Sequence, residues 1–259
     1  MLLTLAYDGR PFSGWARQSN ARTIAGELEG ALRAVDPRAS AARGVSRTDR
    51  GVHARQQKAA FDTTRDIAPR GWALALGPHL PDEISVVGAS RVPVGYDPRR
   101  HAVSKAYRYV LLRSETRDPF LARRAWRIEY RLNQPLMQAE AATLLGEHDF
   151  AAFRSAADTR AETIRRITRA ELRPAPGDPR CVELLIEGNR FMHNMVRIIA
   201  GTLVDVGRGR LPPGTVTRAL ESRRREDLGV TAPPDGLYLD AIELEAEGED
   251  AWPDGPRRD

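Results

Sequence analysis

Cysteine and lysine are the scarcest of the chemically useful residues in this chain. There is one cysteine, Cys181, and all but two of the 40 basic residues are arginines. A single cysteine excludes an internal disulfide and any metal site built from several thiolates. Cys181 begins an alternating run typical of a half-buried strand, so we expect a core thiol rather than a nucleophile.

Long apolar runs and common cofactor motifs are missing as well. No stretch approaches the ~20 apolar residues of a membrane span, and the first residues do not resemble a secretory signal. We therefore expect a cytoplasmic protein with no membrane contact. The five histidines are scattered, without the spacing of a zinc site, and neither GxxxxGK[ST] nor GxGxxG occurs. The sequence predicts no metal and no nucleotide cofactor.

What remains is the composition of an ordinary globular protein with a basic surface. The 259 residues are 41% hydrophobic and 29% charged, which is enough to bury a substantial core. A net charge of +5 and a pI near 9.8 favour an anionic partner. Because the abundant alanines suggest a GC-rich genome, the number of arginines carries less weight than their positions.

Strand and helix signals alternate irregularly along the chain. This mixture predicts an α+β fold rather than a doubly wound sheet. A change of pattern near residue 100 predicts an N-terminal α/β half at 1–100, a C-terminal α/β half at 101–245 and a flexible tail at 246–259. Strands are expected at 2–7, 57–63, 84–92, 103–112, 164–172, 182–187 and 237–244, and helices at 23–35, 69–76, 136–145, 194–206 and 213–221.

One loop, Gly44–Ala54, contains a carboxylate between two arginines. Arg47 and Arg50 would stabilise the ionised form of Asp49, which suits a nucleophile better than a general acid. Taken alone, the pattern fits a solvated charged loop better than a catalytic one.

A second segment, Gly188–Gly201, predicts a helix with a charge on the flank of its apolar face. Arg197 holds that position, and a partly buried guanidinium needs a partner. Asp49 or Asp205 could supply one, or the side chain could reach solvent along its own stem. The sequence alone leaves these alternatives open.

Aromatic residues interleave with arginines at two further places. They are Tyr7–Trp15 and the triplet Tyr107-Arg108-Tyr109. Surfaces that stack unpaired bases combine rings and positive charge in this way.

Taken together, these segments resemble the tRNA pseudouridine synthase A family. The matching pieces occur in order along nearly the whole chain. They are Tyr7-Asp8-Gly9 with Phe12, Gly14-Trp15 and Gln18; Arg47-Thr48-Asp49 with Gly51-Val52-His53-Ala54; Lys105 to Tyr109; His148-Asp149-Phe150 with Phe153-Arg154; Phe191 to Arg197 with Gly201; and Ala232-Pro233-Pro234 with Gly236-Leu237.

The resemblance implies an isomerase that needs no cofactor and converts uridine to pseudouridine at positions 38 to 40 of the tRNA anticodon stem-loop. It implies Asp49 as the nucleophile, attacking C1′ of the ribose or C6 of the base. Arg47 would hold the flipped uridine, Tyr107 would pack on its base, and Arg197 would pair with Asp49. It also implies a homodimer that grips tRNA, and a pseudouridine synthase fold of two α/β halves around a mixed, largely antiparallel sheet with a central cleft.

Two positions depart from the family pattern, and two other functions compete. Ser46 replaces a glycine before Arg47, and Ala16 replaces a glutamine after Trp15. An RNA chaperone on the same fold would bind tRNA without turnover, but it would have no need of a nucleophile. A hydrolase using Asp49 and Asp8 would need one carboxylic acid with a raised pKa, which an arginine-rich surround opposes.

Overall fold

The computed structural model describes residues 1–159 and 161–253. The chain forms two compact units. Unit 1 consists of residues 1–103 and the chain from Leu239 onward, and unit 2 consists of Ser104–Tyr238. Within the described residues, no helix has the length and apolar character needed to cross a membrane.

The sheet of unit 1 is antiparallel in its central pairs. Its order is β11 (Glu249–Trp252), β4 (Ile84–Arg91), β1 (Leu2–Tyr7), β3 (His53–Ala60) and β10 (Leu237–Leu244), with the short β2 (Arg43–Gly44) beside β3. Leu2 lies opposite Ala60 of β3 and Ser90 of β4, so β1 is a central strand.

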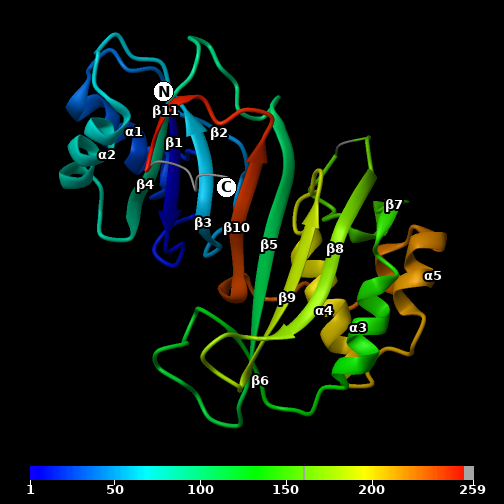
Figure 1. Cartoon of the computed structure of the whole chain (residues 1–259). Helices are drawn as coiled ribbons and strands as arrows, with labels where there is room; N and C mark the ends of the chain where they lie inside the picture. Colours follow the sequence, from blue (N-terminus) through cyan, green and yellow to red (C-terminus); the bar gives the residue numbers. More distant parts are fainter. Residues whose placement is uncertain (160, 254–259) are drawn as a thin grey trace, which may run out of the picture. The chain divides into compact units, whose positions relative to one another are not determined.

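Two helices cover one face of this sheet (Figure 1). In α1 (Ile24–Val35), the hydroxyl of Thr23 caps the first turn by accepting a hydrogen bond from the Gly26 amide at 3.2 Å. In α2 (Pro69–Leu76), the proline occupies the first turn, where its missing N–H costs nothing. Trp72 of α2 is fully buried edge-on against Phe61, with ring centroids 4.9 Å apart.

The sheet of unit 2 is built around a long hairpin. Its order is β5 (Ala102–Arg113), β9 (Cys181–Gly188), β8 (Ile164–Pro174) and β7 (Gly146–Asp149). These neighbours are antiparallel, whereas β6 (Trp126–Ile128) pairs in parallel with the end of β5. Tyr107 of β5 lies opposite Ile186 of β9.

Three helices pack together on one face of the unit 2 sheet (Figure 1). They are α3 (Gln134–Ala142), α4 (Met195–Gly207) and α5 (Thr215–Ser222). Every residue of α4 except Arg197 is buried, so this helix lies within the core rather than on the surface. Short 3₁₀ helices occupy Gly77–His79, Ala151–Phe153, Arg225–Asp227 and Pro234–Gly236.

The α+β prediction is confirmed, and the sheets are mixed and largely antiparallel. Each expected helix and strand is present, with shifts at the ends. The largest is in β3, which begins at His53 rather than at Gln57. The sequence did not predict β2, β6, β7 or β11; the last lies in the segment expected to be a tail, where Glu249–Trp252 pairs with β4. The tail prediction for 254–259 lies outside the described residues.

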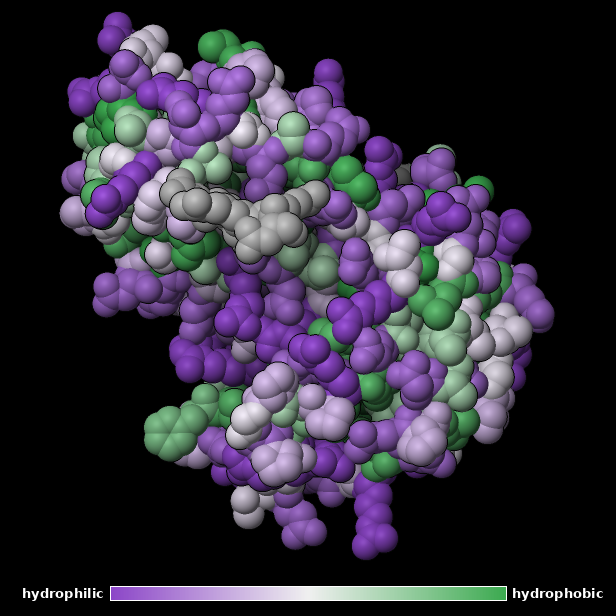
Figure 2. Space-filling model, in the orientation of Figure 1, coloured by the Kyte–Doolittle hydropathy of each residue, from purple (hydrophilic) through white to green (hydrophobic). Residues whose placement is uncertain are grey.

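The surface agrees with the composition. The visible face of the molecule is mainly hydrophilic, with apolar residues scattered over it (Figure 2).

Candidate active site

The loop that carries Asp49 connects β2 to β3 in unit 1. Asp49 is half-buried, whereas Arg47 and Arg50 on either side are exposed. The Val52 amide donates to the Asp49 carbonyl at 3.1 Å, and Gly51 completes the turn with a φ of +80°. The loop therefore turns tightly at the carboxylate and leaves both guanidinium groups facing solvent.

Thr48, the residue before Asp49, is held by hydrogen bonds to both its backbone and its side chain. The Thr48 carbonyl accepts a hydrogen bond from the Trp15 amide at 3.0 Å, and the Thr48 hydroxyl shares one of 2.8 Å with the Tyr7 hydroxyl. Thr48 is 7% exposed. Buried polar groups that are paired in this way resist displacement, because moving them would leave donors and acceptors unsatisfied.

A buried glutamine fixes the loop one step earlier. Gln57 of β3 is fully buried; its amide oxygen accepts from the Ser46 amide at 3.2 Å, and its amide nitrogen donates to the Ser46 carbonyl at 2.6 Å. Ser46 is not among the residues with positive φ, so a side chain is accommodated here without strain. The departure at Ser46 thus leaves the loop's anchor intact.

Two glycines allow the Tyr7–Trp15 segment to lie directly against the loop. A Cβ on Gly9 would lie 2.0 Å from the Val52 carbonyl oxygen, and one on Gly14 would lie 2.7 Å from that of Thr48. Gly14 also has a φ of +91°. Because the obstructing atoms are backbone atoms, larger residues could enter only by moving the loop.

We expect Gln57→Leu to lower the free energy of unfolding by about 2–4 kcal/mol, because the buried amide and carbonyl of Ser46 would lose their hydrogen-bond partners. Urea denaturation of the purified variant measures this. Gln56→Leu is the matched control, because Gln56 is the exposed neighbour on the same strand and its loss is expected to change stability by less than about 0.5 kcal/mol. Equal effects of the two substitutions would contradict the anchoring role of Gln57.

A second acid, Asp8, lies at the end of β1. Burial is the largest single influence and raises its pKa. Hydrogen bonds from Arg10, at 2.9 and 2.8 Å from Nε, act against burial together with smaller influences, and their sum brings the pKa down to about 2. The Arg10 backbone amide and the charge of His53 act in the same direction. Asp8 is therefore held ionised, which does not suit it to be the general acid of a hydrolase.

The low pKa of Asp8 predicts a specific acid sensitivity. The group's contribution to stability is fully present above its unfolded pKa of about 3.9 and is lost as the pH falls toward about 2. We expect Asp8→Asn to destabilise the protein at neutral pH and to differ less from wild type as the pH approaches 2. Urea denaturation along a pH series tests this, with the exposed Asp82→Asn as control. A pH-independent difference would contradict it.

In unit 2, Tyr107 lies on β5 and is 8% exposed. Its ring meets that of Phe191 edge-on, with centroids 5.0 Å apart. Tyr109, two residues along the same strand face, is fully buried and donates its hydroxyl proton to the Pro233 carbonyl at 2.7 Å. Burial raises the pKa of Tyr109, so this hydroxyl remains a structural donor while Tyr107 is the more accessible ring.

Arg197 is held at the start of α4 by two bonds from its side chain. Its Nε donates to the Ala232 carbonyl and its Nη1 to the Asn194 side-chain oxygen, both at 2.8 Å. The Ala232 amide in turn donates to the Arg197 carbonyl at 3.0 Å. These contacts fix the plane of the guanidinium. The partner suggested as an alternative, Asp205, forms ion pairs of 2.6 Å with Arg208 and 3.7 Å with Arg210.

Gly201 allows α4 to lie in close contact with the segment before Ala232. A Cβ on Gly201 would lie 1.8 Å from the Val230 carbonyl oxygen. The sequence indicated Gly201 only as part of a motif, and it did not predict the role of Gln57, because a buried polar residue on a strand has no periodic pattern.

The four predicted site residues are divided between the two units. Asp49 and Arg47 belong to unit 1, and Tyr107 and Arg197 belong to unit 2.

The described residues contain no cluster of three or more histidine, cysteine, aspartate or glutamate side chains that could hold a metal ion.

Part of unit 2 and the start of the segment that follows it match a known protein family. A family model described as tRNA pseudouridine synthase matches residues 141–243, which run from the end of α3 to β10 and include Arg197.

Relatives extend the match to nearly the whole chain. Proteins named tRNA pseudouridine synthase A from Caldicellulosiruptor bescii and Geobacter sulfurreducens are 39% and 40% identical to it, over 92% and 93% of this chain and 97% of each relative. One from Myxococcus xanthus is 39% identical, over 93% of this chain and 90% of its own length. The chain therefore belongs to the tRNA pseudouridine synthase A family.

Proposed function

We propose that this protein isomerises uridine to pseudouridine in the anticodon stem-loop of tRNA, at positions 38 to 40. The observation that carries the proposal is the match to tRNA pseudouridine synthases A over more than nine-tenths of the chain. The anchored loop around Asp49 supports it, because a nucleophile must be presented in a fixed position.

The reaction breaks the bond from N1 of the base to C1′ and forms a bond from C5 to C1′. The hydrogen on C5 is lost as a proton and N1 gains one, so no electrons or water are consumed. We assign the nucleophile to the Asp49 carboxylate, acting at C1′ or at C6. In either case the group must be ionised, which a guanidinium partner favours.

We assign supporting roles to three further side chains. The exposed Arg47, two residues from Asp49, holds the uridine after it leaves the helical stack. Extracting a base costs a few kcal/mol, which contacts in the site must offset. Tyr107, braced by Phe191, packs on the base. Arg197, oriented by Ala232 and Asn194, pairs with Asp49.

The same proposal includes a homodimer that grips tRNA in a positive central cleft, and a place in the cytoplasm, where tRNA is processed. The positive net charge of +5 supports binding to a polyanion.

The test is a tritium-release assay on an unmodified tRNA transcript labelled at C5 of uridine. Release shows that C5 has lost its hydrogen, and carbodiimide labelling with primer extension then maps the product. Stops confined to the anticodon stem-loop are expected. Tight tRNA binding without release or stops on any tRNA would instead favour the chaperone.

A further inference from the structure

The connection between β5 and β6 presents a phenylalanine to solvent. Phe120 is 84% exposed, whereas Phe12, Phe61, Phe150 and Phe153 are each exposed by 1% or less. Single exposed apolar residues are common on protein surfaces, so a role for Phe120 has to come from what surrounds its ring.

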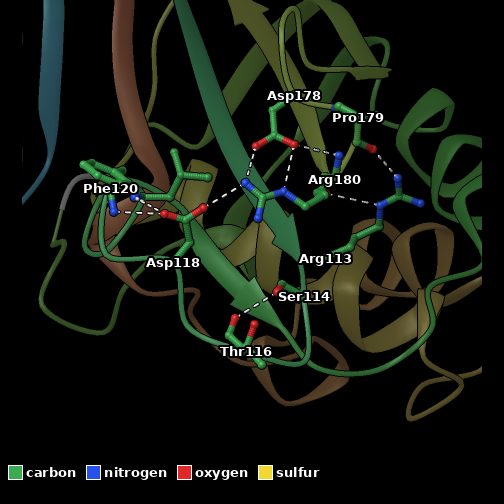
Figure 3. Close-up of polar contacts among 9 residues, drawn as sticks. Arg113, Ser114, Thr116, Asp118, Phe120, Asp178, Pro179 and Arg180 are labelled. Carbon is green, nitrogen blue, oxygen red and sulfur yellow. Dashed lines mark hydrogen bonds and ion pairs between the residues drawn. The ribbon is translucent and has the colours of Figure 1, made fainter.

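The backbone that carries this ring is held in place by a neighbouring carboxylate. One oxygen of Asp118 accepts from the amides of Phe120 at 2.9 Å and Leu121 at 3.3 Å (Figure 3). Its other oxygen forms an ion pair of 2.8 Å with Arg180. The turn is therefore tied to the β8–β9 hairpin, where Arg180 lies.

The hairpin side of this contact is braced in turn. Arg180 also pairs with Asp178 at 2.7 Å, and Arg113 at the end of β5 donates to the Pro179 carbonyl at 2.7 Å (Figure 3). Below the turn, Leu121 packs against a buried cluster of Val110, Leu112, Ala125 and Cys181. The ring of Phe120 thus projects into solvent from a backbone fixed on both sides.

Arginines flank the ring in the sequence: Arg117, Arg123 and Arg124 are exposed within four residues of Phe120. Arg123 pairs with Asp235 at 3.7 Å, and Arg180 is shared between Asp118 and Asp178. A protein partner would need a wide apolar area, whereas Leu121 next to the ring already packs inward. One rigid ring amid guanidinium groups matches the combination that binds unpaired nucleotides, with rings for the bases and charge for the phosphates.

We propose that Phe120 is a stacking platform for an unpaired base of the RNA substrate, with Arg117 and Arg123 contacting the adjacent phosphates. This rests on the proposed function for the identity of the RNA as tRNA. The fixed turn lowers the cost of binding, because the backbone that carries the ring needs no ordering when the base arrives.

Binding of a fluorescent tRNA transcript to the full chain, followed by anisotropy, tests the proposal. Phe120→Ala is expected to raise Kd by about 5- to 100-fold, the range for losing one stacked base. Phe120→Leu is expected to lose most of the same affinity and Phe120→Trp to retain it. Val94→Ala is the matched control, since Val94 is 89% exposed on a loop of unit 1; it is expected to leave Kd unchanged.

The salt dependence of tRNA binding distinguishes the contribution of the Phe120 ring from that of the arginines. Arg117→Ala is expected to reduce the slope of log K against log salt by about 0.7–0.9, the value for one phosphate contact, while Phe120→Ala leaves the slope unchanged. The indole introduced by Phe120→Trp is expected to add emission over wild type that tRNA quenches on stacking.

Two results would overturn the proposal. One is an unchanged Kd for Phe120→Ala. The other is a loss of self-association in Phe120→Ala, measured by light scattering at the concentration of the binding assay, which would make the surface an interface between copies. Pseudouridine mapping distinguishes the stacking proposal from the proposed reaction. Wild-type turnover and affinity in Phe120→Ala would refute the stacking role of Phe120 alone. Phe120-dependent tRNA binding without pseudouridine formation would refute the reaction alone.

Discussion

Asp49→Asn is expected to reduce pseudouridine formation by about 10³-fold or more. The amide keeps the shape of the side chain, but it carries no charge and cannot act as the nucleophile. The affinity for tRNA is expected to stay within about threefold of wild type, because phosphate contacts dominate binding. Tritium release measures the first quantity and fluorescence anisotropy the second.

The matched control is Asp66→Asn, also in unit 1. Asp66 is 90% exposed and pairs only at the surface with Arg91, so its loss is expected to leave turnover intact. Turnover by Asp49→Asn at the wild-type rate would refute the assignment of the nucleophile. Loss of turnover together with loss of tRNA binding would point instead to a collapsed loop.

Gly201→Ala is expected to destabilise the protein by about 3 kcal/mol or more. The new methyl group would lie 1.8 Å from the Val230 carbonyl oxygen, and neither α4 nor the segment facing it can move without disturbing a packed core. The same displacement pulls Ala232 away from Arg197, so we also expect turnover to fall in whatever fraction of the variant remains folded. Urea denaturation and tritium release measure the two effects.

Gly30→Ala provides a control of opposite sign. Gly30 lies in α1, and a Cβ there would meet nothing within 4 Å. Replacing a helical glycine by alanine at such a position is expected to stabilise the protein by about 0.5–1 kcal/mol. A destabilisation by Gly30→Ala similar to that by Gly201→Ala would contradict the explanation by contact with Val230, because a Cβ at Gly30 meets no neighbouring atom.

The sequence predicted those elements whose signals are local. Thr23 caps α1 and Pro69 opens α2, and both helices begin where these residues indicate. The start of β3 at His53 was missed because its exposed and buried residues do not alternate. The short β6 and β7 contain too few residues for a pattern, and their existence depends on pairing with β5 and β8.

In the candidate site, too, the sequence predicted what local motifs mark and did not predict long-range contacts. Asp49, Arg47, Tyr107 and Arg197 were identified because motifs mark them, and their roles stay predictions. The sequence did not reveal what holds them in place, namely the contact of Gln57 with Ser46 across 11 residues and that of Arg197 with Ala232 across 35. Such contacts depend on which strands and helices become neighbours, and no local pattern encodes that.

Unit 1 is assembled from two segments that flank unit 2 in the sequence, and this sets the order in which its sheet can form during synthesis. The strand β10 is completed, and β11 is made, only after unit 2 has been synthesised. Until then β4 lacks its outer neighbour, and unpaired strand edges are where other chains attach. The sheet beside the Asp49 loop therefore reaches its final width only after β11 has been synthesised, and a nascent chain stopped at Tyr238 would contain the whole of unit 2 and an unfinished unit 1.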